Sequence, residues 1–303
     1  MGKPDTTKPA PVGRFAPTPS GRMHLGNLFA AMLAWVSVRH AGGRIILRIE
    51  DLDTERCTVA FADLVKSDLE WLGLDWDEET PPQSGRGEIY RAALDRLTEM
   101  GLTFPCRCTR GELNLINAPH ASDGHPIYPG TCRGLTGLDP ERSAIRLKVP
   151  DEEISFTDGL CGPYRENLAQ ECGDFVLRRA DGVFVYQLAV TVDDGEAGVD
   201  RVVRGRDLIS STPRQIYLQR LLGFGTPEYF HLPILTDAGG EKLSKRDKAL
   251  DMGALRERYT PEKLTGRLAF AAGLIDREEP LSPRELIPSF SWDRVTRRET
   301  IAV

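Results

Sequence analysis

The clearest hydrophobic pattern in the chain begins just after Gly21. Over residues 25–36, apolar side chains recur at the spacing of one helix face: Leu25, Leu28, Phe29, Met32, Leu33 and Val36. Gly42 and Gly43 end this helix, and the β-branched run at 45–49 predicts a buried strand. Residues 12–16 are apolar enough to form a strand before the helix. Together these segments predict the first unit of a parallel α/β sheet.

Helices and strands are expected to alternate through the rest of the chain. Further helices are predicted at 58–72 and 88–100, and each is followed by a glycine. Strands are predicted at 183–192 and 230–236. Three later helix starts have an N-cap residue followed by Pro: Thr212, Thr260 and Ser282.

Two regions interrupt this alternation and define the expected domains. Residues 104–150 carry three cysteines and a loop rich in Gly, Pro and His, which predicts an inserted subdomain within a main domain at 12–255. Residues 256–303 predict a short, mostly helical tail. Residues 1–11 are polar and rich in proline, which predicts a flexible leader.

Composition adds limits to this α/β assignment. Hydrophobic residues make up 40% of the 303 positions and charged residues 28%, which excludes a mainly disordered or collagen-like chain. We expect no membrane contact and a cytoplasmic location, because no apolar stretch approaches the roughly 20 residues of a membrane span and no secretory signal is visible. The net charge of −6 means that any nucleic-acid contact needs a local basic patch.

The segment RFAPTPSGRMHLGN over 14–27 has features of a nucleotide site. Its prolines and Gly21 predict a sharp turn between strand and helix. His24 and Gly26 then lie where free backbone N–H groups and the helix dipole favour a phosphate. A surface histidine beside a turn glycine is the simpler explanation of this motif taken alone.

A second candidate phosphate site is EKLSKRDK, which follows the turn at 238–240. Lys242, Ser244 and Lys245 on a mobile loop are suited to stabilising the charge of a triphosphate. The alternative for this segment alone is a solvated basic loop.

Cysteine spacing indicates a metal site in the insert. Cys106, Cys108 and Cys132 supply three thiolates in a region rich in loops, which favours tetrahedral zinc over free thiols. From chemistry alone, His125 or His120 is the natural fourth ligand. The other cysteines lack ligand spacing, and we expect them to serve in packing: Cys57, Cys161 and Cys172.

In combination, the two phosphate motifs resemble the signature sequences of class I aminoacyl-tRNA synthetases. RIEDLD at 48–53, VRGRDL at 203–208 and HLP at 231–233 are similar to the glutamyl branch of that class. Over 12–250 the chain resembles the glutamyl-Q tRNA(Asp) synthetases, which are paralogues of the glutamyl-tRNA synthetase catalytic domain. The resemblance implies a Rossmann-like catalytic core with a zinc-bearing insert. The tail is too short for a separate anticodon-binding domain, which needs on the order of 100 residues.

The resemblance also implies an activity. Such enzymes use ATP with Mg²⁺ to activate L-glutamate and then load it onto queuosine in the anticodon loop of tRNA(Asp). The implied ATP-binding residues are His24, Gly26, Asn27, Lys242, Ser244 and Lys245, of which His24 and Lys245 are the catalytic ones. The resemblance points to Tyr128 as the fourth ligand of one structural zinc ion. We expect a monomer.

A glutamate pocket should offer cations to two carboxylates and one acid to the ammonium group. Arg14 and Arg204 are suited to the carboxylates, Glu50 to the ammonium, and Tyr186 offers a hydroxyl on an apolar strand. Taken singly, each is equally typical of a surface ion pair or a half-buried tyrosine. The positions that match the family's glutamate site are Arg14, Phe15, Ala16, Pro17, Thr18, Glu50, Tyr186 and Arg204.

The sequence departs from the class pattern at two positions. Arg246 stands where the late motif usually has Ser, and Asn27 stands where the early motif usually has a second His. Three other functions remain open. One is a truncated glutamyl-tRNA synthetase that charges tRNA(Glu), and another is a synthetase-like binding protein without catalysis. The third is a small-molecule nucleotidyltransferase that shares the phosphate site at His24 and Gly26 but needs no glutamate pocket.

Overall fold

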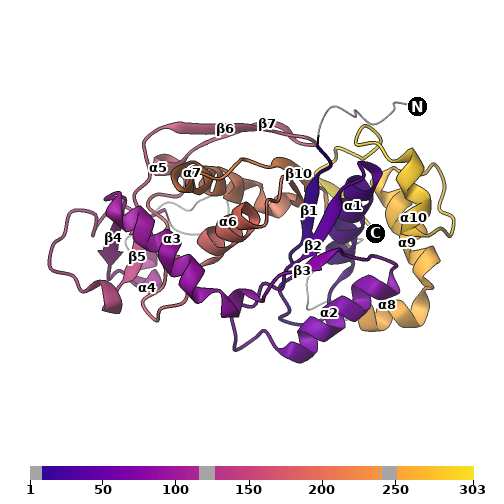
Figure 1. The fold of residues 1–303 in the computed structure, drawn as a ribbon. Helices are drawn as coiled ribbons and strands as arrows, with labels where there is room; N and C mark the ends of the chain where they lie inside the picture. The colour runs from indigo at the N-terminus through magenta and orange to yellow at the C-terminus, as the bar shows by residue number, and fades with distance from the viewer. Residues whose placement is uncertain (1–8, 116–126, 238, 241–250) are drawn as a thin grey trace.

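The first half of the fold is a parallel sheet whose connections are helices. The computed structural model describes residues 9–115, 127–237, 239–240 and 251–303. Strands pair in the order β1-β2-β3, all parallel. Figure 1 shows α1 beside β1 and β2, and α2 below them. The elements are β1 (Val12–Phe15), α1 (Leu25–His40), β2 (Arg44–Leu47), α2 (Val59–Trp71) and β3 (Glu78–Glu79). The strand, turn, helix and strand predicted from the sequence are therefore confirmed.

A second parallel pair, β9-β10, lies against β1. The backbone N–H of Asp200 donates to the Val12 carbonyl at 3.1 Å, and the Val12 N–H donates to the Asp200 carboxylate at 2.8 Å. In the β9-β10 register, Arg204 lies opposite His231. The elements of this half are α6 (Tyr186–Glu196), β9 (Arg201–Gly205), η3 (Arg206–Ser211), α7 (Thr212–Leu222) and β10 (Glu228–Leu232).

Helices cover both faces of the central sheet. Along β2, Ile45 and Leu47 pack into a core with α1 and the tail, whereas Ile46 packs into a core with α6 and α7. Figure 1 shows α6 and α7 on one side of β1 and β2, with α1, α9 and α10 on the other. This is the doubly covered parallel sheet of a Rossmann-like fold.

The strand predicted at 183–192 is wrong, because the chain forms helix α6 from Tyr186. The segment is apolar and β-branched, so its local composition favours a strand. Leu188 through Asp194 are all buried in the structure, which leaves no polar face to mark the helical period. The strand predicted at 230–236 is confirmed in outline as β10 and β11, which are separated by Pro233.

The insert is antiparallel and continues beyond the expected end at 150. Its three-stranded sheet has the order β4-β5-β8, and β6 pairs with β7 as a hairpin. The elements from 83 to 178 are η1 (Gln83–Gly85), α3 (Gly87–Glu99), β4 (Thr103–Cys106), α4 (Arg110–Leu115), η2 (Pro140–Arg142), β5 (Ala144–Leu147), β6 (Glu153–Asp158), β7 (Gly162–Asn167), α5 (Leu168–Glu171) and β8 (Val176–Arg178). The helices predicted at 58–72 and 88–100 are confirmed as α2 and α3 within one residue at each end.

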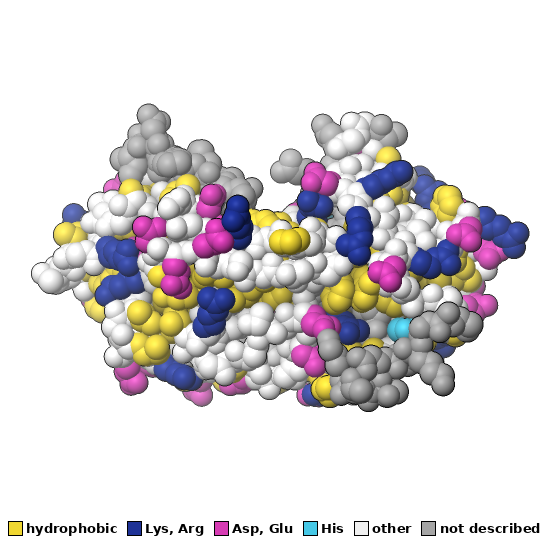
Figure 2. Space-filling model, turned by 90° about the horizontal axis from the view of Figure 1, so that it is seen from above, with side chains coloured by type: hydrophobic (Ala, Val, Ile, Leu, Met, Phe, Trp, Pro, Cys, Tyr) yellow, Lys and Arg dark blue, Asp and Glu magenta, His cyan; other side chains and the backbone are white. Residues whose placement is uncertain are grey.

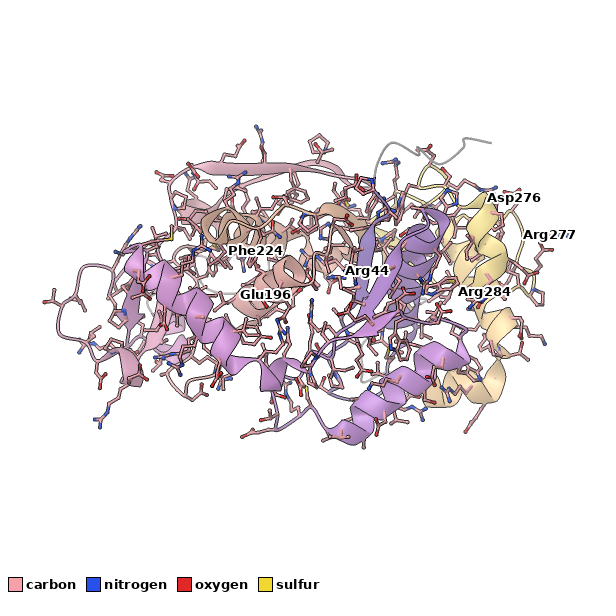
Figure 3. All side chains as sticks on the ribbon, in the orientation of Figure 1. Arg44, Glu196, Phe224, Asp276, Arg277 and Arg284 are labelled. Atoms are coloured by element: carbon pink, nitrogen blue, oxygen red, sulfur yellow. The ribbon has the colours of Figure 1, made fainter. Side chains whose placement is uncertain are left out.

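The tail is mostly helical and adds a strand to the main domain. Strand β12 pairs in parallel with β11, and the Trp292 ring stacks on Phe230 with centroids 4.0 Å apart. The side chain of Arg284, labelled in Figure 3, reaches Asp75 at 2.6 Å. The elements are β11 (Ile234–Thr236), α8 (Met252–Arg258), α9 (Pro261–Ala272), α10 (Pro283–Leu286), η5 (Ile287–Ser289) and β12 (Thr300–Ala302).

The predicted helix starts are confirmed with one shift. Thr260 caps α9 by accepting from the Lys263 N–H, and Ser282 forms a capping box with Glu285. At α7 the N-cap is Ser211, and Thr212 is the first helical residue. The Thr212 hydroxyl is therefore available to the site described below. Within the described ranges, no helix is both long and apolar enough to cross a membrane.

Candidate active site

One cavity of about 460 Å³ lies where β1 and β9 end and α1 begins. Such a volume is typical of a small-molecule site. All the glutamate- and ATP-binding residues predicted from the sequence that the structure describes line it: Arg14, Phe15, Ala16, Pro17, Thr18, His24, Gly26, Asn27, Glu50, Tyr186 and Arg204. The structure therefore brings together residues of three motifs that are far apart in the sequence: RFAPTPSGRMHLGN at 14–27, RIEDLD at 48–53 and VRGRDL at 203–208.

His24 is the N-cap of α1. Its Nδ1 accepts from the Gly26 N–H at 3.1 Å, so the hydrogen of the neutral ring lies on Nε2. A Cβ at position 26 would lie 3.0 Å from the His24 ring, so this ring position favours glycine there. Asn27 closes the cap, because its side-chain oxygen accepts from the His24 N–H at 3.0 Å. The departure at Asn27 thus has a structural role in the helix start.

The late phosphate motif falls outside the described residues, together with its predicted side chains Lys242, Ser244 and Lys245 and the unusual Arg246. The chain on its C-terminal side is described. Asp251 forms a β-bridge with His24, and the Met252 N–H donates to the Met23 carbonyl at 2.9 Å. Only five residues separate Lys245 from Asp251 in the sequence. The chain that follows the late motif is therefore described again at the start of α1.

Arg204 is held by four hydrogen bonds at the end of β9. Its Nε donates to His231 Nε2 at 3.0 Å, and its Nη2 donates to the Thr212 hydroxyl at 2.8 Å and the Leu208 carbonyl at 3.4 Å. Its Nη1 donates to the Tyr186 hydroxyl at 3.3 Å. Arg204 is only 5% exposed, so its guanidinium has one fixed orientation.

Arg14 and Glu50 belong to a buried ionic network at the same end of the cavity. Arg48 donates to Asp194 at 2.6 Å and to Glu50 at 3.0 Å, and Arg14 lies 3.5 Å from Asp194. Burial opposes the ionised form of Asp194, but Arg48 and Arg14 outweigh it and lower the pKa of Asp194. For Glu50, burial prevails over Arg48 and Arg14 and raises the pKa. A further cation next to Glu50 would favour its ionised form.

Tyr186 lies at the first position of α6, not on a strand as predicted. Its hydroxyl still reaches Arg204, because the N-terminus of α6 faces the end of β9. Burial raises the pKa of Tyr186, so it acts as a neutral O–H group.

Sequence reasoning missed the residues that hold these groups in place. Arg48 is part of the quoted RIEDLD motif and His231 is part of HLP, but neither was assigned a role. Asp194 follows Tyr186 by eight residues, and only its burial beside Arg48 shows its importance. Figure 2 shows that the basic side chains of the described residues are interspersed with acidic ones on the face viewed from above.

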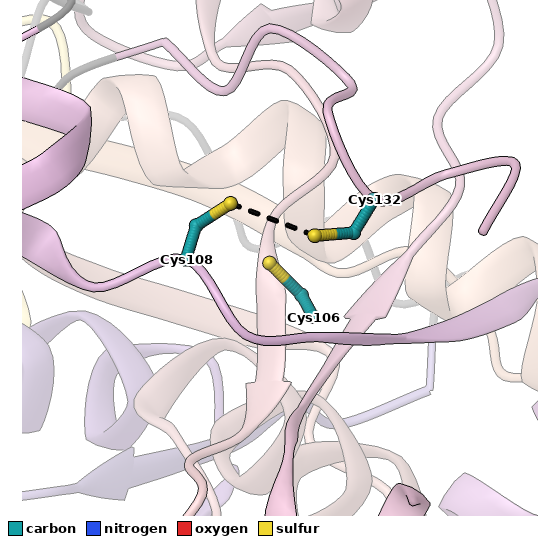
Figure 4. Close-up of side chains that lie close together, drawn as sticks. All are labelled: Cys106, Cys108 and Cys132. Carbon is teal, nitrogen blue, oxygen red and sulfur yellow. Dashed lines mark hydrogen bonds between the residues drawn. The ribbon is translucent and has the colours of Figure 1, made fainter. Parts of the chain in front are cut away.

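The three predicted zinc ligands meet in the insert (Figure 4). The sulfurs of Cys106, Cys108 and Cys132 all lie within 4.8 Å of one another. The Cys108 and Cys132 sulfurs are 3.5 Å apart, close to the roughly 3.8 Å expected on a tetrahedral zinc ion with Zn–S bonds of about 2.3 Å. Burial raises the pKa of Cys108 to about 12. Burial also acts on Cys132, but the backbone of Arg107 and the side chain of Tyr128 lower its pKa to about 7.

Tyr128 lies beside this cluster. Its hydroxyl oxygen is 3.5 Å from the Cys106 sulfur and accepts from the Cys132 N–H at 2.7 Å. The Arg146 guanidinium lies 3.8 Å from the centre of its ring. The alternative ligands His120 and His125 lie outside the described residues. The donor set of three sulfurs and one oxygen therefore suits zinc. As for the other thiols, Cys57 and Cys172 are buried and Cys161 is partly buried.

Comparisons with known proteins agree with this geometry. A family model described as the catalytic domain of class I tRNA synthetases (E and Q) matches residues 12–302. The glutamyl-Q tRNA(Asp) synthetase of Symbiobacterium thermophilum is 49% identical over 96% of this chain and 97% of its own length. The enzyme of the same name from Nitratidesulfovibrio vulgaris is 47% identical over 95% of this chain and 94% of its own.

Solved structures show the same core. The glutamate-tRNA synthetase of Elizabethkingia anophelis superposes with a TM-score of 0.82 at 27% identity, over 96% of this chain and 67% of that one. A glutamate tRNA ligase from Elizabethkingia meningosepticum, solved in complex with its amino acid, gives 0.81 at 28% identity, over 96% of this chain and 66% of that one. The chain belongs to the glutamyl-Q tRNA(Asp) synthetase family of enzymes, within the class I tRNA synthetases of the glutamyl and glutaminyl branch.

Proposed function

We propose that this chain activates L-glutamate with ATP to glutamyl-adenylate and transfers the glutamyl group to queuosine in the anticodon of tRNA(Asp). One observation carries the proposal. A single cavity is lined both by two arginines and a carboxylate, Arg14, Arg204 and Glu50, and by the N-terminus of α1 with His24. The family and the names of the relatives supply the substrate class.

The buried end of the cavity is suited to glutamate. Arg14 and Arg204 offer N–H groups to its two carboxylates, and the Tyr186 hydroxyl supplements Arg204. Glu50 binds the ammonium group, because one of its oxygens is held by Arg48 and the other accepts no hydrogen bond from the described residues. Glutamate is thereby bound by groups that are already oriented, which reduces the ordering cost of binding.

The end at α1 is suited to ATP. The Nε2–H of His24 and the positive end of the α1 dipole stabilise phosphate oxygens. We assign Gly26, Asn27, Lys242, Ser244 and Lys245 to the same ligand, with Mg²⁺ accompanying ATP as part of the substrate. The glutamate carboxylate attacks the α-phosphorus, and the charge that grows on pyrophosphate is stabilised by His24 and Lys245. In the second step, a hydroxyl of the nucleoside attacks the mixed anhydride, and we propose the adenylate phosphate as its base.

We further propose one zinc ion in the insert, held by Cys106, Cys108, Cys132 and Tyr128. A closed tetrahedral site of this kind stabilises a fold and takes no part in the reaction. The phenol oxygen of Tyr128 is already directed at the cluster by the Cys132 N–H. Burial and the neighbouring thiols raise the pKa of Tyr128, so the metal itself would supply the charge that stabilises its phenolate.

The test of the activation step is ATP–pyrophosphate exchange. We expect exchange with glutamate and none with aspartate, in the absence of tRNA. Arg204→Ala should raise the glutamate KM at least tenfold. Exchange that does not depend on glutamate would contradict the proposed pocket, and no exchange would favour a binding protein without catalysis. The tRNA that accepts labelled glutamate separates tRNA(Asp) loading from tRNA(Glu) charging.

A further inference from the structure

A buried histidine and a buried aspartate lie behind Arg204, on the side away from the cavity. His231 on β10 and Asp158 at the end of β6 have fully buried side chains, and the His231 Nδ1 lies 2.6 Å from Asp158 Oδ2. The other ring nitrogen, Nε2, lies 3.0 Å from Arg204 Nε. Neither His231 nor Asp158 lines the cavity. Three charged or titratable side chains from three strands therefore form one line that ends at the site.

The partners of Asp158 fix which ring nitrogen of His231 carries the proton. Asp158 Oδ1 accepts from the backbone N–H groups of Leu160 at 2.9 Å and Cys161 at 2.8 Å. Asp158 Oδ2 accepts from the His231 ring and also lies 3.1 Å from the His231 backbone N–H. A carboxylate so placed requires a donor at Nδ1. The Nε2 of a neutral ring is then an acceptor, as the Arg204 Nε–H needs.

The same arrangement determines which donors of Arg204 face the cavity. Of its five N–H groups, Nε–H is directed at His231 and the two of Nη2 at Thr212 and Leu208. The Thr212 hydroxyl also lies 3.2 Å from His231 Nε2, so it can donate to the ring while it accepts from Arg204. One Nη1 N–H donates to the Tyr186 hydroxyl, and the other has no acceptor among the described residues; Arg204 and Tyr186 both line the cavity. One guanidinium N–H group and one phenol O–H group thus form a matched donor pair for a single carboxylate.

We propose that His231 and Asp158 are positioning residues that direct Arg204 Nη1 at a carboxylate of the bound amino acid through the Nδ1–H tautomer of His231. The inference rests on the proposed role of Arg204 in glutamate binding. Asp158 fixes the Nδ1–H tautomer of His231, Nε2 of His231 accepts from the Nε–H of Arg204, and Arg204 contacts the substrate. An imidazolium or the Nε2–H tautomer would direct a hydrogen at the Arg204 Nε–H and would turn the guanidinium away.

Two substitutions of His231 separate positioning from a merely structural role. In His231→Asn, the amide nitrogen takes the place of Nδ1 and still donates to Asp158, but Arg204 Nε loses its acceptor. In His231→Gln, the amide oxygen reaches the Nε2 position and still accepts from Arg204, but Asp158 loses its donor. We expect H231N to raise the glutamate KM about tenfold, as for a lost hydrogen bond to a charged group, and H231Q to raise it much less.

Stability should follow the opposite order, because H231Q leaves the buried Asp158 without its ring partner. The midpoint temperature of thermal unfolding should therefore be lower for H231Q than for H231N. The ATP KM of both variants should stay within twofold of the wild type. His40→Asn is the matched control. The His40 Nδ1 also has a hydrogen-bond partner, the Ile287 carbonyl at 2.7 Å, and neither residue lines the cavity. A glutamate KM that follows stability across these variants would overturn the proposal.

Asp158→Asn tests the tautomer itself. The Asn oxygen must stay on the Leu160 and Cys161 N–H groups, so its NH₂ group faces Nδ1 and forces the hydrogen onto Nε2. Nitrogen-15 NMR of the His231 ring should show a neutral Nδ1–H tautomer in the wild type and Nε2–H in D158N, with a glutamate KM raised about as much as in H231N. An imidazolium or Nε2–H ring in the wild type overturns the proposal whatever the substrate is. If Arg204→Gln leaves the glutamate KM unchanged, the proposed function fails instead.

Discussion

The glutamate end of the cavity and the cysteine cluster of the insert are organised in opposite ways. At the cavity, β1, β2, α6 and β9 supply arginines and carboxylates that orient one another. At the insert, the hydrophobic cluster has five buried residues: Phe104, Cys106, Leu113, Tyr128 and Cys132. Three of the five, Cys106, Tyr128 and Cys132, are candidate zinc ligands. The protein alone preorganises the first site, whereas we propose that the second takes its order from a zinc ion. The two sites should therefore fail in different ways.

The largest effect is expected where the cavity's buried network is broken. Arg48→Met removes the cation that lies between Asp194 and Glu50, so Glu50 loses its ion pair and Asp194 keeps only the one with Arg14. Loss of one partner from a buried ion pair costs about 3–5 kcal/mol of unfolding free energy. Urea unfolding measures this cost.

The matched control for Arg48→Met lies four residues earlier on β2. Arg44, labelled in Figure 3, is exposed and pairs with Glu78 at the surface. Arg44→Met should change stability by less than about 1 kcal/mol. Equal losses in the two variants would show that the buried network does not organise the site.

The catalytic end of the cavity should lose rate without losing stability. Lys245→Ala should lower the rate of glutamate-dependent exchange by about 10²–10³, because it removes one donor to the departing pyrophosphate. Lys263→Ala, at an exposed position on α9, is the control. The unfolding midpoint should not change in either variant. Near wild-type exchange in K245A would remove this lysine from the mechanism.

The third effect is a loss of stability at acidic pH, which originates at His231, the buried residue behind Arg204. Burial lowers the pKa of His231 from 6.5 to about 4, against the opposing influence of Asp158 and with the help of Arg204 and Arg14. Because the unfolded chain takes up a proton first, this contribution is complete above pH 6.5 and is lost as the pH falls toward 4. The loss is at most about 3.5 kcal/mol for this lowering of the pKa. Asp158, whose pKa is lowered, adds a further loss below pH 3.8.

His231→Gln should remove the His231 part of that pH dependence. We expect the stability difference between wild type and variant to shrink as the pH falls from 6.5 to 4. A constant difference over this range would mean that His231 does not titrate as the burial requires.

The smallest effect is expected at the insert. Chelation of the metal, or Cys108→Ala, should lower the unfolding midpoint by at least about 2–4 °C, the shift for 1 kcal/mol in a chain of this size. The glutamate KM should stay unchanged, since the cluster shares no residue with the cavity. Elemental analysis should give about one zinc per wild-type chain. A metal-free chain of equal stability would contradict the comparison between the two sites.

The sequence predicted the parts of this site that depend on local chemistry. The turn before α1 and the caps of α9 and α10 follow from residues within a few positions of one another. The three cysteines could be assigned to one metal site from their spacing, because two of them, Cys106 and Cys108, lie on one short segment. Motif resemblance identified the cavity residues although the secondary structure of Tyr186 was predicted wrongly.

What the sequence did not predict depends on contacts between distant segments. Arg48 and Asp194 are separated by 146 positions, and His231 and Asp158 by 73. A charged residue is expected at the surface unless its partner is known, because unpaired charges are rarely buried. The nearly uniform burial of α6 likewise comes from helices and strands on both sides of it, which local composition does not encode.

The account is tested most directly by incubating the protein with ATP and labelled glutamate together with three RNAs: tRNA(Asp) with queuosine, tRNA(Asp) without it, and tRNA(Glu). Label should be found only on tRNA(Asp) that carries queuosine, and it should remain in the anticodon fragment after nuclease digestion. Arg204→Ala should reduce this labelling at low glutamate. Label at the acceptor end of tRNA(Glu), or equal labelling of tRNA(Asp) with and without queuosine, would contradict the account.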